Sequence, residues 1–178
     1  FGFKGGLTYK ITGRHMLDFN GAYLTKAPYL KNVFTNARLN NNLSPGLGSE
    51  RIMSVDASYI IKTPKFKSRV TGYFSKIQNS ARLAYFYGEG LFEEDPDSNT
   101  SEDSFVSEII TGINKRNMGV EFGFEYQITA TIKATGAATY SESIYDNNPR
   151  LRINDDAQAS ATNTNPLTDF GYAYWKNY

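Results

Sequence analysis

Residues 118–140 read MGVEFGFEYQITATIKATGAATY, and the apolar residue at every second position of this stretch decides the fold. Val120, Phe122 and Phe124 alternate there with acidic or small residues. Successive side chains of a β-strand point to opposite faces, so the pattern predicts a strand with one apolar face and one polar face. A second alternating stretch follows after a brief turn, and residues 116–141 are therefore expected to form a β-hairpin.

Two other segments, residues 2–25 and 51–78, follow the same pattern. The turns inside the three hairpins are short, whereas about 25 residues or more separate one hairpin from the next. Soluble β-domains usually keep their connections short at both ends of a sheet. Outer-membrane barrels combine short periplasmic turns with long extracellular loops. The chain is therefore predicted to be all-β, an antiparallel segment of a transmembrane β-barrel.

A single partial barrel domain over residues 1–178 is the expected organisation. Its long extracellular loops are predicted at residues 26–50, 79–115 and 141–169, and a further strand at 170–178. Residues 104–113 are the one stretch where a helix is expected. The six or seven strands are fewer than the eight a closed barrel requires. The chain does not start with Met and contains no signal peptide, so we expect it to be a piece of a longer protein.

Pairing within two hairpins can be predicted from the turn positions. A turn centred on residues 13–15 places Ile11 opposite Leu17, Tyr9 opposite Phe19, Gly5 opposite Tyr23, and Lys10 opposite Asp18. A turn centred on Thr129 places Glu125 opposite Lys133 and Phe122 opposite Gly136, where an aromatic ring compensates for the missing side chain. In the middle hairpin Asp56 is expected to reach Arg69 or Lys67. Opposite charges across a strand pair stabilise it by about 0.2–1 kcal/mol.

Composition narrows the functional classes. The net charge of +1 gives no reason to expect nucleic acid as a partner. The absence of Cys excludes disulfides and thiolate metal sites. No apolar run approaches the roughly 18 residues of a membrane helix, whereas alternating strands can cross a membrane with modest mean hydropathy.

The two faces of the predicted barrel wall are expected to meet different surroundings. The polar face is predicted to line the lumen with charges that brace the wall or contact a plug. These charges are Lys10, Asp18, Asp56, Arg69, Glu121, Glu125 and Lys133. Two aromatic girdles are expected on the apolar face, about 25 Å apart. Tyr9, Phe19, Tyr59 and Tyr126 lie near the short turns, and Phe1, Phe3, Tyr23, Phe74 and Tyr140 near the long loops.

Several stretches carry a family resemblance. They are Phe3-Lys4-Gly5-Gly6-Leu7-Thr8-Tyr9, residues 21–29 (GAYLTKAPY), Asn32-Val33-Phe34, Asn42-Leu43-Ser44-Pro45, Glu50-Arg51-Ile52, Asp146-Asn147-Asn148-Pro149 and residues 174–178 (YWKNY). Their order resembles the C-terminal barrel half of TonB-dependent outer-membrane receptors, in particular the SusC/RagA-like branch. Residues 43–51 approximate the family phrase Asn-Pro-x-Leu-x-x-Glu, with Ser44 in place of the usual Asn.

The resemblance implies a 22-stranded barrel in the outer membrane of a Gram-negative bacterium. It implies an N-terminal plug, energy supplied through TonB, and uptake of a scarce nutrient such as a siderophore, oligosaccharide, peptide or cobalamin. The implied partners are outer-membrane lipid, TonB acting through the plug, and a surface lipoprotein lid. This chain contains no plug and no TonB box. Its final residues Phe170, Tyr172, Tyr174 and Tyr178 alternate like a C-terminal insertion signal, whereas the family pattern continues into further strands.

Catalysis is not expected, and no cofactor or metal site is predicted. His15, the only histidine, is expected to be a solvated turn residue because no nucleophile is placed near it. The acidic residues between 89 and 108 lack the spacing of an EF-hand and are expected to be a solvated loop. Glu121 and Glu125 resemble a glycosidase pair, but both have basic partners that keep them ionised. The glycine pairs 46/48 and 88/90 are too short to form phosphate loops.

Aromatic residues near the loop ends are the candidate ligand-binding residues, because their faces stack on sugars, peptides or chelates. They are Tyr29, Phe34, Tyr85, Phe86, Tyr87 and Trp175. Two alternatives remain open from the sequence. One is a secreted soluble β-sandwich or jelly roll that binds carbohydrate, which would bury the apolar faces between two sheets. The other is a small outer-membrane adhesin barrel that transports nothing.

Overall fold

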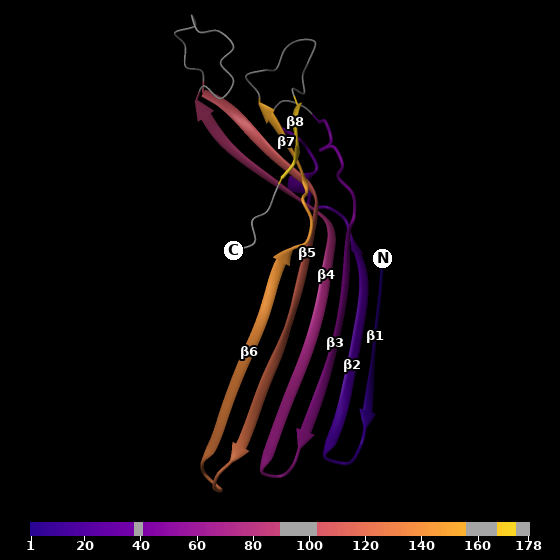
Figure 1. The fold of residues 1–178 in the computed structure, drawn as a ribbon, viewed down its shortest axis with the longest axis vertical. Helices are drawn as coiled ribbons and strands as arrows, with labels where there is room; N and C mark the ends of the chain where they lie inside the picture. The colour runs from indigo at the N-terminus through magenta and orange to yellow at the C-terminus, as the bar shows by residue number, and fades with distance from the viewer. Residues whose placement is uncertain (38–40, 90–102, 156–166, 174–178) are drawn as a thin grey trace, which may run out of the picture. The chain divides into compact units, whose positions relative to one another are not determined.

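The computed structural model describes residues 1–37, 41–89, 103–155 and 167–173. They form eight strands and one helical turn (Figure 1). The elements are β1 Gly2–Lys10, β2 His15–Lys26, η1 Leu30–Asn32, β3 Glu50–Lys62, β4 Phe66–Glu89, β5 Asp103–Gln127, β6 Lys133–Tyr145, β7 Arg150–Asp155 and β8 Leu167–Tyr172.

The strands belong to one antiparallel sheet, which confirms the predicted all-β class. The strand order is β1-β2-β3-β4-β5-β7-β8, and β6 also pairs with β5. Among the described residues this order has free ends, so the sheet does not close on itself. The chain divides into two compact units, and β4 and β5 contribute to both.

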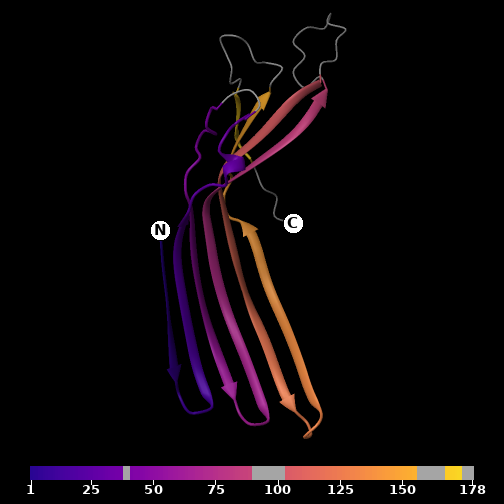
Figure 2. The same cartoon turned by 180° about the vertical axis from the view of Figure 1, so that it is seen from behind.

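Unit 1 consists of Phe1–Lys26, Arg51–Ile77 and Lys115–Asp146, the three predicted hairpins. Its strands follow one another as an antiparallel meander, with the three short turns at the same end (Figures 1 and 2). Backbone hydrogen bonds join neighbouring turns: the Lys62 N–H donates to the Arg14 carbonyl, and the Gln127 N–H donates to the Lys65 carbonyl, each over 2.8 Å.

A threonine organises each short turn of unit 1. The hydroxyl oxygens of Thr12, Thr63 and Thr129 accept the backbone N–H of the residue three positions later, over 3.2, 2.9 and 3.0 Å. Such local side-chain bonds stabilise turns by replacing backbone bonds that the ladder no longer provides. The three turns therefore share one construction although their sequences differ.

These turns shift the predicted pairings by two residues. Tyr9 lies opposite Leu17, Leu7 opposite Phe19, Gly5 opposite Gly21, and Thr8 opposite Asp18. In the last hairpin Gln127 lies opposite Lys133 and Phe124 opposite Gly136. The predicted partners were therefore wrong, because the first turn is centred one residue earlier than expected, on Gly13, and the last turn one residue later, on Ala130. A shift of two leaves every side chain on its predicted face, since the side-chain period of a strand is two.

Unit 2 consists of Ala27–Glu50, Gln78–Asn114 and Asn147–Tyr178. It holds all the buried hydrophobic side chains of the described residues, and these are Val106, Ile109, Ile110 and Ile113 on β5. Ile109 and Ile110 point to opposite faces of the strand, so β5 is covered on both sides here. A strand buried on both faces loses the polar–apolar alternation that identifies it in a sequence.

Four predictions are corrected here, and the burial of β5 on both faces accounts for the first. The predicted helix at 104–113 is instead part of β5, consistent with its β-branched residues. The predicted loop 79–115 is strand over its described residues 79–89 and 103–115. The predicted loop 141–169 includes the end of β6, all of β7 and the start of β8. The last strand runs over 167–172 rather than 170–178, and residues 174–178 lie outside the described part.

Candidate functional site

Unit 1 has two chemically different faces. On β3, the exposed residues Met53, Val55, Ala57 and Tyr59 alternate with the more buried Ser54, Asp56 and Ser58. The apolar face continues over the other strands, where Leu7 is 66% exposed and Tyr140 is 78% exposed. No buried hydrophobic residue belongs to the described residues of this unit. The apolar side chains of unit 1 therefore form a surface and not a core.

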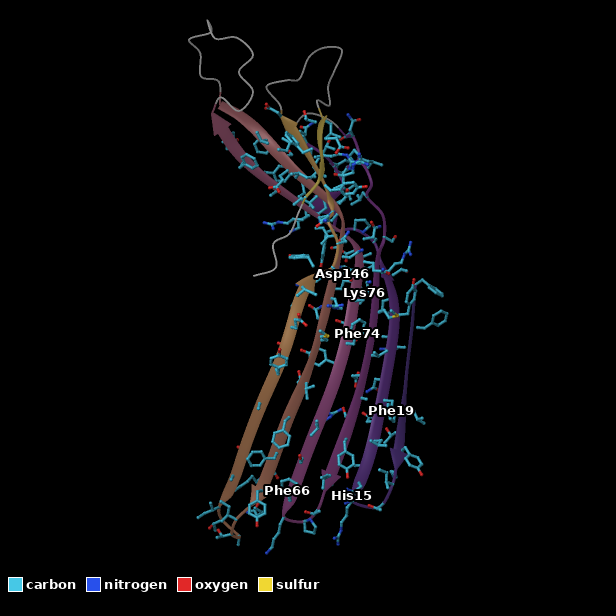
Figure 3. All side chains as sticks on the ribbon, in the orientation of Figure 1. His15, Phe19, Phe66, Phe74, Lys76 and Asp146 are labelled. Carbon is cyan, nitrogen blue, oxygen red and sulfur yellow. The ribbon has the colours of Figure 1, made fainter. Side chains whose placement is uncertain are left out.

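Charged residues end the apolar face at the strand ends that lie opposite the short turns. By strand parity, Arg51, Lys76, Arg116 and Glu142 occupy the next positions after the apolar rows of β3, β4, β5 and β6. Lys76 also forms an ion pair with Asp146 over 3.1 Å (Figure 3). The apolar face thus ends at a row of charges, which we call the charged border.

The opposite limit of the apolar face lies at the short turns. His15 Nδ1 lies 2.7 Å from the Tyr59 hydroxyl. The Phe66 and Tyr126 rings lie 6.4 Å apart at the same end, and Figure 3 places His15 and Phe66 there. His15 is partly exposed, and it begins β2 and does not lie inside the turn as expected. Amphipathic side chains of this kind suit a boundary between apolar and aqueous surroundings.

Between these limits the apolar rows of three strands have the same length. Residues 53–61 of β3, 66–74 of β4 and 118–126 of β5 each span nine residues. A transmembrane β-strand needs about 9–11 residues when it is tilted by about 45°. Each of these three rows is therefore within the length range of a transmembrane β-strand.

The polar face is connected by hydrogen bonds and ion pairs. Asp18 accepts a hydrogen bond from the Thr8 hydroxyl over 2.7 Å and lies 3.6 Å from the Arg69 guanidinium. Arg69 also donates to the Ser58 hydroxyl over 3.2 Å. Asp56 accepts a hydrogen bond from the Asn20 amide over 3.0 Å. Arg69 therefore pairs with Asp18 on β2, and the predicted pairing with Asp56 was wrong.

A second cluster of the polar face surrounds Glu125. Its carboxylate lies 3.0 Å from Lys67 on β4 and 3.3 Å from Lys133 on β6. The predicted ion pair between Glu125 and Lys133 is confirmed, although the two residues lie on a diagonal and not directly opposite. Lys10 and Glu121 share the polar face but form no ion pair with any described residue.

Aromatic rings cover glycines on both faces. The Phe124 ring lies 2.5 Å from the place where a Cβ of Gly136 would be. The Tyr73 hydroxyl lies 2.7 Å from the corresponding place at Gly119. The predicted aromatic–glycine contact thus exists at Gly136, but Phe124 makes it and not Phe122. A side chain at either glycine would therefore require the neighbouring aromatic ring to move.

The predicted ligand-binding aromatics belong to unit 2 where they are described. Tyr85 and Tyr87 lie on one face of β4, with ring centroids 5.4 and 5.3 Å from that of Phe105 on β5. Phe86 points to the other face by strand parity. Partial burial raises the pKa of the Tyr85 hydroxyl. Phe105 was not predicted as a ligand-binding residue because it lies within residues 79–115, where a loop with a helix at 104–113 was expected.

The other predicted ligand residues are not part of this ring cluster by position. Tyr29 precedes η1 and is exposed, and Phe34 is half-buried and forms a bridge with Leu43. Trp175 lies outside the described residues. The structure therefore brings together two of the six predicted residues, with Phe105 as the third ring.

Polar contacts hold the segment before β3 in unit 2. The Asn32 amide donates to the Ala81 carbonyl over 2.7 Å, and the Ser80 hydroxyl donates to Glu50 over 2.6 Å. The Arg152 guanidinium donates to the Pro45 carbonyl over 3.0 Å. These bonds attach the described residues Asn32, Pro45 and Glu50 of the predicted loop 26–50 to β4 and β7.

Within the described ranges, no helix is long and apolar enough to cross a membrane. The same residues contain no group of three His, Cys, Asp or Glu side chains that could hold a metal ion. Comparisons with protein-family models, curated proteins and solved structures found no match for this chain.

Proposed function

We propose that this chain is a part of the β-barrel of a TonB-dependent outer-membrane receptor of the SusC/RagA-like kind. Its task is to bind a scarce nutrient outside the cell and to permit its gated passage, with energy supplied by TonB through a plug. Unit 1 forms part of the membrane-spanning wall, and unit 2 supplies the surfaces that meet the ligand and a lipoprotein lid. Catalysis is not part of this function.

The exposed apolar face of unit 1 carries the proposal. Monomeric soluble proteins rarely expose contiguous apolar patches larger than a few hundred Å². Here the apolar rows of six strands are exposed, nine residues long on three of them, and limited by the charged border at one end. Outer-membrane lipid is the partner that matches both the chemistry and the length of this surface.

The polar face supports the same function. Barrel lumens are polar, and their charges are satisfied by neighbours on adjacent strands. The contacts of Asp18 with Arg69 and of Glu125 with two lysines provide such neighbours. In this arrangement the charged border lies outside the hydrocarbon layer, where water solvates its residues.

The secreted β-sandwich is less compatible with these observations. A sandwich covers the apolar face of one sheet with a second sheet about 10 Å away. No buried apolar layer exists among the described residues of unit 1. The small adhesin barrel uses the same apolar face for lipid, and nutrient uptake is the property that separates it from the receptor.

Fractionation of cells that produce the native protein tests the proposal. We expect the protein in the outer-membrane fraction, released by detergent and not by high salt or urea. Uptake should then depend on TonB. Recovery in the aqueous periplasmic or secreted fraction would contradict the proposal, and outer-membrane recovery without TonB-dependent uptake would favour the adhesin.

A further inference from the structure

A groove of about 310 Å³ lies in unit 2 beside the β7–β8 pair. Thr111, Asn148, Arg150, Arg152 and Tyr172 contribute to its lining. None of these residues was singled out as a ligand-binding residue on the basis of the sequence. The groove combines two guanidinium groups, an amide and an aromatic ring, which are groups that recognise polar ligands.

A β-bulge determines the electrostatics of this groove. Leu151 lies opposite Gly171, whereas Arg152 lies opposite Asp169, so Phe170 is the extra residue of β8. Gly171 has a φ of +78°, a backbone conformation that glycine adopts without strain. Bulges re-aim neighbouring side chains and occur next to functional sites. Here the bulge places the Asp169 carboxylate between Arg150 and Arg152.

The two arginines differ in how many of their donors are occupied. Asp169 lies 3.0 Å from Nε of Arg150 and 3.3 Å from Nε of Arg152. The terminal Nη1 of Arg152 donates to the Pro45 carbonyl and lies 3.4 Å from the Thr111 hydroxyl. No described residue accepts a hydrogen bond from the terminal nitrogens of Arg150, whose side chain is 49% exposed.

The Arg150 guanidinium packs over the ring of Tyr172. The guanidinium carbon lies 5.8 Å from the ring centroid, within the range of a cation–π contact. Asp169 at Nε and Tyr172 at the face fix the orientation of the guanidinium. Its terminal N–H groups remain available as a fork, the geometry that binds a planar oxyanion with two hydrogen bonds.

We propose that this groove binds a carboxylate group of the ligand, with Arg150 as the principal donor and Tyr172 as a stacking surface. The inference names the ligand class of the proposed receptor and rests on that function. Binding is nevertheless measured on the purified protein without transport, so a failure of binding is distinct from a failure of membrane localisation.

Charge balance favours a carboxylate over a phosphate monoester. Arg150 and Arg152 contribute two positive charges, and Asp169 contributes one negative charge. A single carboxylate neutralises the remaining charge. A phosphate monoester carries about −1.5 to −2 at neutral pH, and it would leave excess negative charge beside Asp169.

Calorimetric titration of the native protein in detergent with benzoate tests the proposal. Benzoate can place its carboxylate at Arg150 and its ring on Tyr172, and benzamide is its neutral isostere. We expect benzoate to bind at least about tenfold more tightly than benzamide, the effect of one charged hydrogen bond. Equal binding of both compounds, or tighter binding of inorganic phosphate, would overturn the proposal.

Two variants that break the same ion pair should have opposite effects. Arg150→Gln removes the donor and should weaken benzoate binding by about tenfold or more. Asp169→Asn keeps an oxygen that can accept from Nε of Arg150 but removes the negative charge beside the ligand, so it should strengthen benzoate binding. A purely structural role of the ion pair would weaken binding in both variants, because both lose it.

Lys115→Gln provides a matched control. Lys115 also lies over a tyrosine ring, 5.9 Å from the centroid of Tyr145, but it belongs to unit 1. Its substitution should leave the affinity for benzoate unchanged. A loss as large as that of Arg150→Gln would contradict the assignment of the site to the groove.

Discussion

Three threonines determine where the hairpins of unit 1 turn. Thr12 and Thr63 each accept a backbone N–H from the residue that begins the return strand, and Thr129 accepts one from Ile132, the residue just before β6. The hydroxyl thereby fixes which residues face each other across the strands. Valine has the same shape as threonine but cannot accept this bond, so it isolates the contribution of the hydroxyl.

Thr129→Val should lower the free energy of unfolding by about 1 kcal/mol, the usual net contribution of such a hydrogen bond. Thr135→Val, on the polar face of β6, is the control and should change stability by less than about 0.5 kcal/mol. Urea unfolding of the protein reconstituted in vesicles measures both. Equal effects of the two substitutions would mean that the turn does not depend on the hydroxyl.

Asp169 is the residue whose ionisation should affect unit 2. The Gly171 N–H, followed by the charge and hydrogen bond of Arg150, holds the pKa of this carboxyl below its ordinary value. A lowered pKa stabilises the folded state above the ordinary pKa of about 3.9. This stabilisation is lost as the pH falls through the lower pKa of the folded protein.

Hydrogen exchange of the β7 amides should therefore accelerate in the wild-type protein as the pH is lowered beyond about 3.9, after correction for the intrinsic exchange rate. Asp169→Asn should remove this additional pH dependence. If both proteins show the same corrected profile, the contacts of the Asp169 carboxylate do not stabilise β7.

At the scale of elements, the sequence predicts faces well and partners less well. All three hairpins form, and Glu125 pairs with Lys133 as expected, because alternation defines the face of each side chain. The exact partners depend on the turn, and the alternation of residues does not reveal that the His15 N–H donates to the Thr12 hydroxyl. The part of β5 in unit 2 was missed because Ile109 and Ile110 are buried on opposite faces, so the strand does not alternate there.

The groove at Arg150 could not be predicted for a similar reason. Arg150 and Arg152 lie two residues apart in a stretch expected to be a loop, and their partner Asp169 is distant in sequence. Only the bulge at Phe170 brings the carboxylate opposite Arg152. Sequence spacing gave no sign of this bulge apart from Gly171, which has many other uses in strands.

Engineered disulfides test the register of the first hairpin. The chain has no Cys, so a pair of substitutions gives an unambiguous readout. Leu7→Cys with Phe19→Cys should form a disulfide, because these residues lie directly opposite. Tyr9→Cys with Phe19→Cys should not, because diagonal neighbours are about 7–8 Å apart, beyond the usual reach of a disulfide. The reverse result would restore the pairing predicted from the sequence.

At the scale of the whole molecule, the exposed apolar face is the property that needs an explanation. Contact with lipid explains this face, because exposing so much apolar surface to water is unfavourable and an apolar medium removes that cost. The lipid account predicts that charge is tolerated on one face of each strand of unit 1 and not on the other.

Adjacent substitutions on β6 test this asymmetry. Ala138 lies on the apolar face and Thr139 on the polar face, and both are exposed. Ala138→Arg should lower the free energy of unfolding in vesicles by about 2 kcal/mol or more, since arginine within the hydrocarbon layer costs about 2–4 kcal/mol near its centre. Thr139→Arg should cost less than about 0.5 kcal/mol. Similar costs at both positions would contradict lipid contact.

The most direct test of lipid contact is the accessibility of nitroxide spin labels in the native membrane. Labels at Leu7, Val70, Phe122 and Phe124 should collide with oxygen and be protected from a water-soluble nickel reagent. Labels at the neighbouring positions Thr8, Thr71 and Gly123 should not show this preference for oxygen. Free access of the nickel reagent to the first set would show that the apolar face does not contact lipid.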